Sequence, residues 1–448
     1  MERKKRVRVL IISHNAFSET NNLGKTLLNY FRDFSSEELA QFYIQDNYPE
    51  NIGICNNYYR FTDRDALKSL FGINTRHSFK TSDLKNVTAV NHDPAIESIR
   101  QYGRRRNVLV YFLRNIIWRL ANWNTEELYE WLNAFDPDVI LFMSGDYKFM
   151  YKITLTIQKV LNKPLVVWCG DDHYIYNRNE SSFFGRLQHK HFFKTVKKVM
   201  EKASCLFTVS DLMRDDYQKL FNKTCFTLHT GAEERKISAA DNNGKIAYFG
   251  NLGYKRGESL LDIGRALRSL GLKGSEEINV YSGEKNPDNL KGFTSENGIK
   301  FHGEISSSEV ADRMAECIMI IHAESFDNKI QKMIKYSVST KIADSLLNGS
   351  CLLAYGPEGL ASIDYLKKNK AAFVITRQED LKAGLREILT NAPLRSEIIS
   401  NARNLAKMNH DAAVTTENVR KWLKMAIDRT VESNCAAGIE TYENTADQ

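Results

Sequence analysis

Short apolar runs alternate with amphipathic helical patterns along the first half of the chain. The apolar run at 7–13 (VRVLIIS) leads into a polar loop at 14–22 and then into a helical pattern at 23–34. Runs of the same kind recur at 138–144, 164–170 and 205–210. A strand with both faces buried is apolar throughout, and parallel strands need helical crossovers, so this order predicts a parallel sheet covered by helices.

The second half repeats the alternation. Its apolar runs lie at 245–251, 277–283, 300–303, 316–325, 350–356 and 371–376. We therefore predict an α/β fold of two Rossmann-like, doubly wound domains, 1–233 and 244–430, that face a central cleft. The polar stretch 233–244 is the expected hinge. Residues 431–448 lack periodicity and are expected to form a flexible tail.

Composition and charge narrow the classes of function. With 448 residues, 42% hydrophobic and 26% charged, the chain has the size and composition of a folded two-domain protein. The whole net charge of +7 falls before residue 234, which favours an anionic partner for the first half. Seven scattered cysteines without a Cys-x-x-Cys pair favour a reducing cytosol. Neither G-x-G-x-x-G nor G-x-x-x-x-G-K-[ST] is present, so a dinucleotide oxidoreductase and a phosphate-loop NTPase lose support.

The stretch from Glu324 to Pro357 carries the most chemistry. It contains HAESFD, then SVSTKIADSLLNG, then LLAYGP. This stretch resembles the donor-binding region of GT-B glycosyltransferases of the family 4-like (group 1) type, which serve bacterial polysaccharide and cell-surface glycan biosynthesis. The resemblance extends to YFGNL at 248–252, FHG at 301–303, TVS at 208–210 and the opening strand, so it covers nearly the whole chain.

The resemblance implies a retaining hexosyltransferase without a metal or other cofactor. Its donor would be a nucleotide-diphosphate sugar, with UDP among the candidate nucleotides, held mainly by the second domain. Its acceptor would be a lipid-linked or polysaccharide glycan on the side of the first domain. We expect a cytoplasmic protein, peripheral at the inner face of the cell membrane and in contact with anionic lipid. Nucleic acid is not an expected partner, because no nucleic-acid-binding motif accompanies the positive charge.

The residues themselves favour a phosphate site where the helical pattern begins at Lys341. Hydroxyls and a cation at a helix N-terminus attract a diphosphate, so Ser337, Ser339, Thr340 and Lys341 are expected to bind the donor. The simpler alternative is that Ser339 or Thr340 only caps the helix. Asp344, one turn further on, has the position to accept hydrogen bonds from a ribose diol.

Other candidates flank the expected strands of the second domain. In the resembling family, two glutamates seven residues apart contact the donor sugar and the ribose. Glu324 and Asp344 correspond to them here, although nineteen residues intervene, and a loop carboxylate is the alternative for Glu324. Lys255 and Arg256 are expected to neutralise the leaving diphosphate, or else to be a solvated pair. Asn251, in the matching segment, is counted with the donor-binding residues.

In the first domain the candidates are Gly24 and Asp172. Gly24 opens a helix, where a bare backbone permits close approach by phosphate or sugar, although a helix cap explains it as well. Asp172, with its neighbours Asp171 and His173, follows a buried strand and is expected as a base, an orienting group or a loop residue.

The arginine-rich segment 104–123 has two interpretations, a helix on an anionic bilayer or a helix packed on its own sheet. Two rival functions also stay open. One is a GT-B-type nucleotide-sugar epimerase, and the other is a catalytically inactive GT-B relative that serves as a membrane-associated assembly subunit. Nucleotide release that depends on an acceptor separates these rivals from a transferase.

Overall fold

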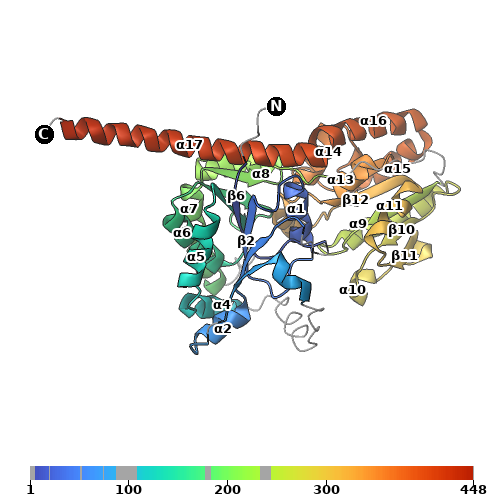
Figure 1. Ribbon diagram of the computed structural model, residues 1–448. Helices are drawn as coiled ribbons and strands as arrows, with labels where there is room; N and C mark the ends of the chain where they lie inside the picture. Colours follow the sequence, from blue (N-terminus) through green and yellow to red (C-terminus); the bar gives the residue numbers. More distant parts are fainter. Residues whose placement is uncertain are drawn as a thin grey trace. The chain divides into compact units, whose positions relative to one another are not determined.

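The computed structural model describes residues 6–19, 21–50, 53–73, 75–86, 108–176, 183–232 and 244–446. The chain forms two compact units, each with its own sheet (Figure 1). Unit 1 comprises Met1–Thr208, Arg214–Leu228 and Thr416–Gln448, and unit 2 comprises Val209–Met213 and His229–Thr415. The expected hinge, apart from its last residue, lies outside the described residues.

The described residues of unit 1 form an eight-stranded sheet in the order β4-β3-β2-β1-β5-β6-β7-β8, parallel except where β4 joins β3. The strands are β1 (Val9–Ser13), β2 (Leu39–Tyr43), β3 (Asn57–Arg60), β4 (Ser78–Lys80), β5 (Val139–Ser144), β6 (Leu165–Cys169), β7 (Cys205–Thr208) and β8 (Cys225–Thr227). The helices in this part are α1 (Asn22–Phe31), α2 (Asp63–Ser69), α4 (Val108–Leu120), α5 (Glu126–Phe135), α6 (Lys148–Leu161), α7 (Phe183–Lys202) and α8 (Asp211–Phe221), with a 3-10 turn, η1 (Thr81–Asn86).

The strands predicted for the first half are confirmed as β1, β5, β6 and β7. Every residue of β1, β5 and β6 is buried, as a sheet covered on both faces requires. The strands β2, β3, β4 and β8 were not predicted.

The described residues of unit 2 form a six-stranded parallel sheet in the order β11-β10-β9-β12-β13-β14. Its strands, all predicted, are β9 (Lys245–Phe249), β10 (Ile278–Tyr281), β11 (Ile299–Gly303), β12 (Cys317–Ala323), β13 (Cys351–Tyr355) and β14 (Phe373–Ile375). Its helices are α9 (Arg256–Leu270), α10 (Pro287–Leu290), α11 (Ser307–Ala315), α12 (Asn328–Ile334), α13 (Lys341–Leu347), α14 (Ala361–Lys368), α15 (Leu381–Thr390) and α16 (Ala392–Asn409), with 3-10 turns η2 (Ser295–Asn297) and η3 (Gln378–Asp380).

Helices cover both faces of this second sheet. Leu260 of α9 and Leu385 of α15 pack against one face, and Leu346 of α13 and Leu405 of α16 pack against the other. The doubly wound α/β architecture predicted from the sequence is therefore confirmed in unit 2.

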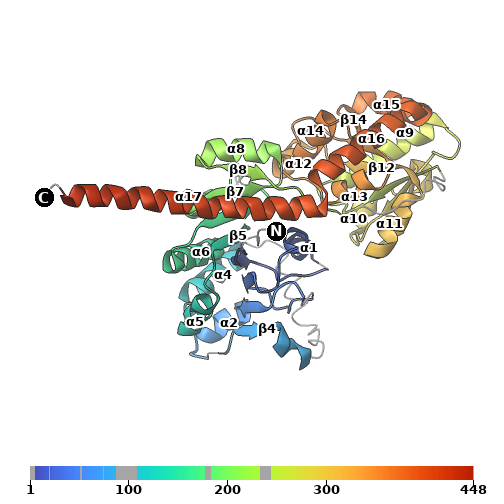
Figure 2. The same ribbon diagram turned by 45° about the horizontal axis from the view of Figure 1, so that its top comes forward.

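The last helix, α17 (Ala412–Ala446), corrects the expected end of the second domain. From Thr416 onward the chain belongs to unit 1, where Figure 2 shows α17 beside β7 and β8. The ring of Trp422 stacks on Phe226 of β8 at 4.8 Å, and Arg420 pairs with Glu38 at 2.7 Å. The helix also continues through most of the segment expected to be a flexible tail. Among the described helices, none is both long enough and apolar enough to span a membrane.

Candidate functional site

The candidate site lies where β9 and β12 end, at the carboxyl edge of the unit 2 sheet. From β9 the chain winds outward through β10 and β11, and then crosses to β12 on the other side of β9. The loops that follow β9 and β12 therefore diverge. Such a topological switch point is where open α/β sheets bind their ligands.

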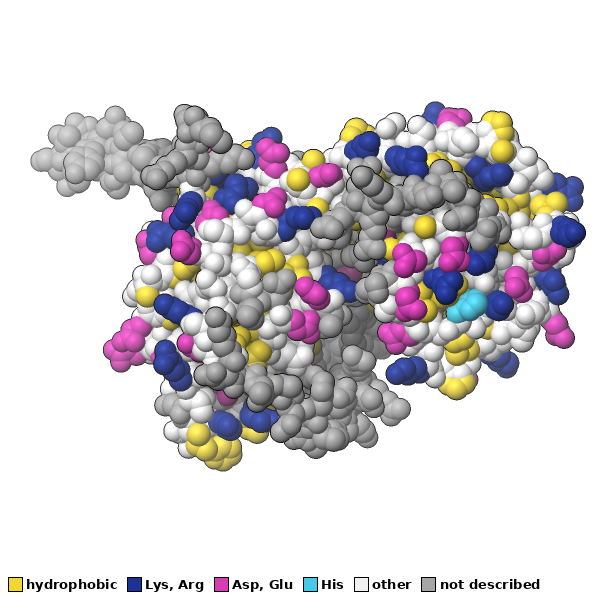
Figure 3. Space-filling view, turned by 45° about the vertical axis from the view of Figure 1, so that its right-hand side comes forward, with side chains coloured by type: hydrophobic (Ala, Val, Ile, Leu, Met, Phe, Trp, Pro, Cys, Tyr) yellow, Lys and Arg dark blue, Asp and Glu magenta, His cyan; other side chains and the backbone are white. Residues whose placement is uncertain are grey.

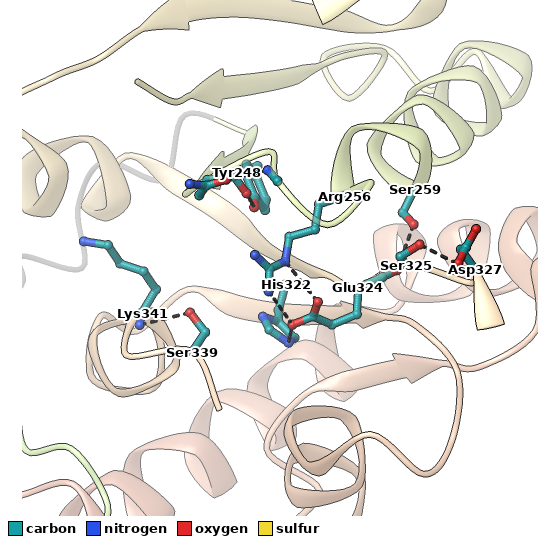
Figure 4. A network of polar contacts seen from close by, with 11 residues as sticks. Tyr248, Arg256, Ser259, His322, Glu324, Ser325, Asp327, Ser339 and Lys341 are labelled. Carbon is teal, nitrogen blue, oxygen red and sulfur yellow. Dashed lines mark hydrogen bonds and ion pairs between the residues drawn. The ribbon is translucent and has the colours of Figure 1, made fainter. Parts of the chain in front are cut away.

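Arg256, the first residue of α9, forms a two-pronged ion pair with Glu324, the first residue after β12. Nε and Nη2 donate to the two carboxylate oxygens at 3.0 and 3.1 Å (Figure 4). The side chain of Glu324 is 3% exposed and that of Arg256 is 17% exposed. Burial lowers the pKa of Arg256, but the charge and hydrogen bonds of Glu324, together with the phenols of Tyr248 and Tyr254, outweigh this and the pKa is raised. The pair is thus a fixed, charge-assisted contact.

Backbone contacts and a glycine hold Glu324 in position. Its N–H donates to the carbonyl of Tyr355 at 2.9 Å, and its carbonyl accepts from the hydroxyl of Ser259 at 2.8 Å. A Cβ on Gly356 would lie 2.9 Å from the Cβ of Glu324 and 3.1 Å from Ile363. Only a residue without a side chain at 356 leaves Glu324 where it is.

His322 faces Glu324 from the end of β12, although the sequence analysis did not single it out. The two residues are two positions apart and so share one face of the strand. Nε2 of His322 lies 3.5 Å from Oε1 of Glu324, is buried, and makes no hydrogen bond. Burial lowers the pKa of His322, Glu324 raises it and Arg256 lowers it, and the net pKa is lowered. The ring is therefore neutral near pH 7.

The loop between β9 and α9 holds the other residues predicted there. The phenol of Tyr248 donates to the carbonyl of Asn251 at 2.7 Å. Tyr254 and Lys255 take φ values of 58° and 57°, a conformation that residues with side chains rarely adopt and that is often found at functional sites. Lys255 is half exposed, and its Nζ donates to Asp327 at 2.8 Å. The adjacent cations therefore differ, since Arg256 points inward and Lys255 lies at the surface.

The residues predicted around the start of α13 lie at the same end of unit 2. In Figure 4, Ser339 and Lys341 lie on one side of the Arg256–Glu324 pair, and Asp327 lies on the other. The hydroxyl of Ser339 accepts from the N–H of Lys341 at 3.3 Å, so it bonds one of the first backbone N–H groups of α13 from just before the N-cap residue, Thr340.

Lys341 and Asp344 face solvent rather than a closed pocket. Nζ of Lys341 lies 3.9 Å from Asp344, and both side chains are more than two-fifths exposed. Thr340 is the exposed N-cap residue of α13 without a side-chain cap bond, and Ser337 is partly buried just before it. Lys341 and Asp344 therefore remain accessible to a ligand.

At position 24 the packing of the protein itself requires a glycine. A Cβ on it would lie 2.6 Å from the Cβ of Ser18 and 2.7 Å from its backbone nitrogen. The bare backbone therefore makes room for the protein's own loop, and a contact of Gly24 with the donor stays a prediction. Asn21 caps α1 by accepting from the N–H of Gly24 at 2.7 Å.

Asp172 organises the loop that follows β6. Its carboxylate accepts from the N–H groups of Tyr174, Ile175 and Tyr176 at 2.9–3.0 Å and from the hydroxyl of Tyr217 at 2.9 Å. The residue is buried. Four donors already occupy its oxygens, which agrees with the loop residue among the three predicted roles, and a catalytic role stays a prediction.

The arginine-rich segment is described from Val108 onward, and residues 104–107 lie outside the described part. Trp118 is buried, stacks on Phe149 at 4.3 Å and donates to Asp63 at 2.6 Å. Arg114 donates to the same carboxylate at 2.8 Å. This face of α4 is packed in the core, as one of the two interpretations predicted.

Comparisons with known proteins bear on the fold. No protein-family model and no curated protein sequence matches the chain. Among solved structures, HepE from Anabaena in complex with UDP matches with a TM-score of 0.61, at 12% identity over 93% of this chain and 100% of that chain. TarM matches with a TM-score of 0.59, at 10% identity over 95% and 100% of the two chains. WaaG, a glycosyltransferase involved in lipopolysaccharide biosynthesis, matches with a TM-score of 0.51, at 14% identity over 92% and 98%.

These structural neighbours are GT-B glycosyltransferases, and the alignments span both sheets. The chain therefore has the GT-B fold that the sequence resemblance implied. Among the described residues, no group of three or more His, Cys, Asp or Glu side chains is placed to hold a metal ion.

Proposed function

We propose that this chain is a glycosyltransferase that moves a hexosyl group from a nucleotide-diphosphate sugar, bound by unit 2, to a lipid-linked or polysaccharide acceptor. The observation that carries the proposal is the Arg256–Glu324 pair at the switch point of a GT-B sheet. Arg256 begins a fifteen-residue helix, so its guanidinium and the helix N-terminus both favour an anion there. HepE binds UDP and UDP-glucose, which supports UDP sugars as the first donors to test.

The proposed chemistry assigns each group a task. Transfer breaks the bond between the anomeric carbon and a phosphate oxygen, so negative charge grows on the leaving diphosphate. Arg256, with Lys255 and Lys341 at the surface, would stabilise that charge. Glu324 would accept hydrogen bonds from the donor sugar and Asp344 from the ribose. No step of this scheme uses a metal ion, and retention of configuration stays the expected outcome.

A matched pair of arginine variants tests the proposal. Arg256 and Arg265 both belong to α9, but Arg265 is exposed and contacts only Asn297 among the contacts described for it. We expect UDP-glucose to raise the melting temperature of the wild type and of Arg265→Met but not of Arg256→Met. We also expect kcat/KM of Arg256→Met to fall by about a hundredfold, or about 2.7 kcal/mol.

Three results would count against the transferase. Normal donor binding and turnover by Arg256→Met would contradict the assigned site. Release of nucleotide without any acceptor would favour the epimerase. Binding of donors without turnover, across a panel of nucleotide sugars and acceptors, would favour the inactive assembly subunit.

Peripheral attachment to an anionic membrane is the second part of the proposal, and an apolar patch on unit 1 supports it. The helices α2 and α4 contact each other, and large apolar side chains of α2, of the residues that follow it and of α4 are exposed. In Figure 3, hydrophobic side chains lie beside Lys and Arg at the lower end of unit 1, where Figure 1 labels both helices. The patch consists of Leu67, Leu70, Phe71, Ile73, Phe112, Leu113, Ile116 and Leu120, which are 36–75% exposed.

Positively charged side chains indicate that the partner of this patch is anionic. Burial, and then the nearby charges of Lys152 and Arg119, lower the pKa of Lys148, so these three cations lie close together. Exposed apolar side chains together with a group of cations match the surface of an anionic bilayer. Trp118 of the arginine-rich segment is in the core, so the proposed membrane-contacting surface is this patch.

Vesicle co-sedimentation tests the membrane contact. The double variant Phe112→Ser/Leu120→Ser should lose binding to vesicles that contain phosphatidylglycerol, while Phe183→Ser, an equally exposed change on α7, should retain it. Binding of the wild type should weaken with salt and be absent on neutral vesicles. Unchanged binding of the double variant would contradict the proposal.

A further inference from the structure

A buried histidine nitrogen without a hydrogen bond lies next to the proposed donor site. Nε2 of His322 is 3.5 Å from the carboxylate of Glu324, and that carboxylate is held instead by Arg256. Polar atoms buried in this way nearly always have a partner. The exception indicates that His322 has a different partner in another state of the site.

Ligand binding at Arg256 would create that state. A diphosphate that engages the guanidinium competes with Glu324 for the same cation. Glu324 is 3% exposed, and a buried carboxylate that loses its cation is costly. His322 is the ionisable side chain that faces it from the same strand (Figure 4).

The groups around His322 come from each element that packs near it. Arg256 faces it from α9 and Glu324 from the end of β12, and these are the two charges described as acting on it. Tyr248 on β9 contributes a phenol that is bonded to a carbonyl. On the face of the sheet that α13 covers, Lys341 and Asp344 are exposed and paired with each other. Charge balance at His322 therefore depends on Arg256.

We propose that His322 takes up a proton from solvent when a nucleotide diphosphate engages Arg256, and that the imidazolium then holds Glu324 in place. The inference rests on the proposed donor site. A protonated ring carries a hydrogen on both nitrogens, so Nε2 becomes a donor toward Glu324. A shift of about 0.5 Å brings the two atoms to normal hydrogen-bond distance. The proton returns to solvent when the diphosphate leaves and Arg256 pairs with Glu324 again.

The linkage fixes the sign of the pH dependence. In the free protein the pKa of His322 is lowered, so the ring is neutral above its ordinary value of 6.5. Binding that takes up a proton is favoured at lower pH, so Kd should rise with pH by up to about tenfold per pH unit. UDP-glucose is the suitable probe, because a terminal phosphate, as in UDP, itself titrates near pH 6. His322 is a positioning residue in this scheme.

Calorimetry in two buffers of different ionisation enthalpy counts the protons taken up. Near pH 7 the wild type should take up a measurable fraction of a proton per UDP-glucose bound. His322→Gln should bind without uptake and with a flat pH profile, while His302→Gln, a change of a histidine that is bonded to Asn279 on a neighbouring strand, should behave as the wild type. Binding without uptake in the wild type, or with undiminished uptake in His322→Gln, would overturn the inference.

A second measurement needs no ligand and separates this inference from the proposed function. Arg256→Met removes the cation that disfavours the imidazolium, so the NMR titration of His322 should move to higher pH, and that of His302 should not. An unmoved titration of His322 overturns the inference whatever the chain binds. If the wild type fails to bind UDP-glucose but the titration moves, the chosen donor is wrong and the coupling of His322 to Arg256 stands.

Discussion

The Arg256–Glu324 pair predicts a large and pH-dependent loss of stability when its cation is removed. Arg256→Met keeps the apolar stem but leaves a carboxylate that is 3% exposed without its partner. Removal of one partner of a buried pair costs about 3–5 kcal/mol. Because the Arg256 side chain keeps 17% exposure, we expect the low end of that range, about 3 kcal/mol. For a unit of this size that corresponds to a fall of about 6–12 °C in melting temperature.

The sign of the pH dependence follows from the charge left behind. In Arg256→Met, the folded protein relieves the penalty by binding a proton on His322 beside Glu324, because the cation that disfavours the imidazolium is gone. A histidine in the unfolded chain, with an ordinary pKa near 6.5, is mostly neutral at pH 7. The folded variant then binds more protons than the unfolded chain, so its stability falls as pH rises. The deficit relative to the wild type should therefore shrink toward pH 5.

Urea denaturation of a double-mutant cycle measures the pair directly. Glu324→Gln removes the charge that needs a cation, so Arg256→Met/Glu324→Gln should be more stable than Arg256→Met alone. Arg265→Met on the same helix is the control and should change stability by less than about 0.5 kcal/mol. The reasoning fails if Arg256→Met loses less than about 1 kcal/mol at every pH, or if the two single effects simply add.

Three further predictions follow from other contacts. Asp172→Asn should lower the free energy of unfolding by about 2–3 kcal/mol and leave the Kd for UDP-glucose unchanged. A lower kcat without loss of stability would instead favour a catalytic role for Asp172. Burial raises the pKa of Glu38, but hydrogen bonds from Arg420 and the backbone outweigh burial and lower the pKa to about 2. Stability measured by acid denaturation should therefore fall as pH drops from 4.5 toward 2, and Glu38→Gln should flatten that profile. Lys341→Ala should lower kcat in steady-state kinetics, while Asp344→Asn should mainly raise the donor KM. If melting curves show lowered stability of Lys341→Ala and its rates are normal, α13 is an ordinary capped helix.

The sequence predicted strands whose two faces are both apolar and missed those with a polar residue inside. The strand β2 (LAQFY) is fully buried, but Gln41 interrupts its apolar run. That amide donates to the hydroxyl of Ser13 at 2.8 Å and to the carbonyl of Asn15 at 3.0 Å, partners that only the fold supplies. The short edge strand β4 is antiparallel and only partly buried, so it carries little pattern to detect.

Individual residues of the candidate site were predictable from the sequence, but the contacts between them were not. Arg256 was predicted because it follows an apolar run, and Glu324 because it corresponds to a glutamate of the resembling family, yet the two residues are 68 positions apart. Their contact follows from the sheet order that makes β9 and β12 neighbours, and no local pattern encodes that order. Asp172 was predicted because it follows a buried strand, and Gly24 because it opens a helix, but the structure places both against other parts of the protein itself.

Each of the three cations assigned to the diphosphate already has a carboxylate partner in this structure, so donor binding is an exchange of partners rather than the filling of an empty charge site. The pairs are Lys255 with Asp327, Lys341 with Asp344, and Arg256 with Glu324. The two lysine pairs lie at the surface, where solvent weakens ion pairs, so a diphosphate can separate them easily. The arginine pair is buried, and its separation needs a replacement charge beside Glu324. The surface lysines would therefore govern how a donor is first captured, and the availability of a proton for His322 would govern how firmly the donor engages the residue that stabilises the leaving group.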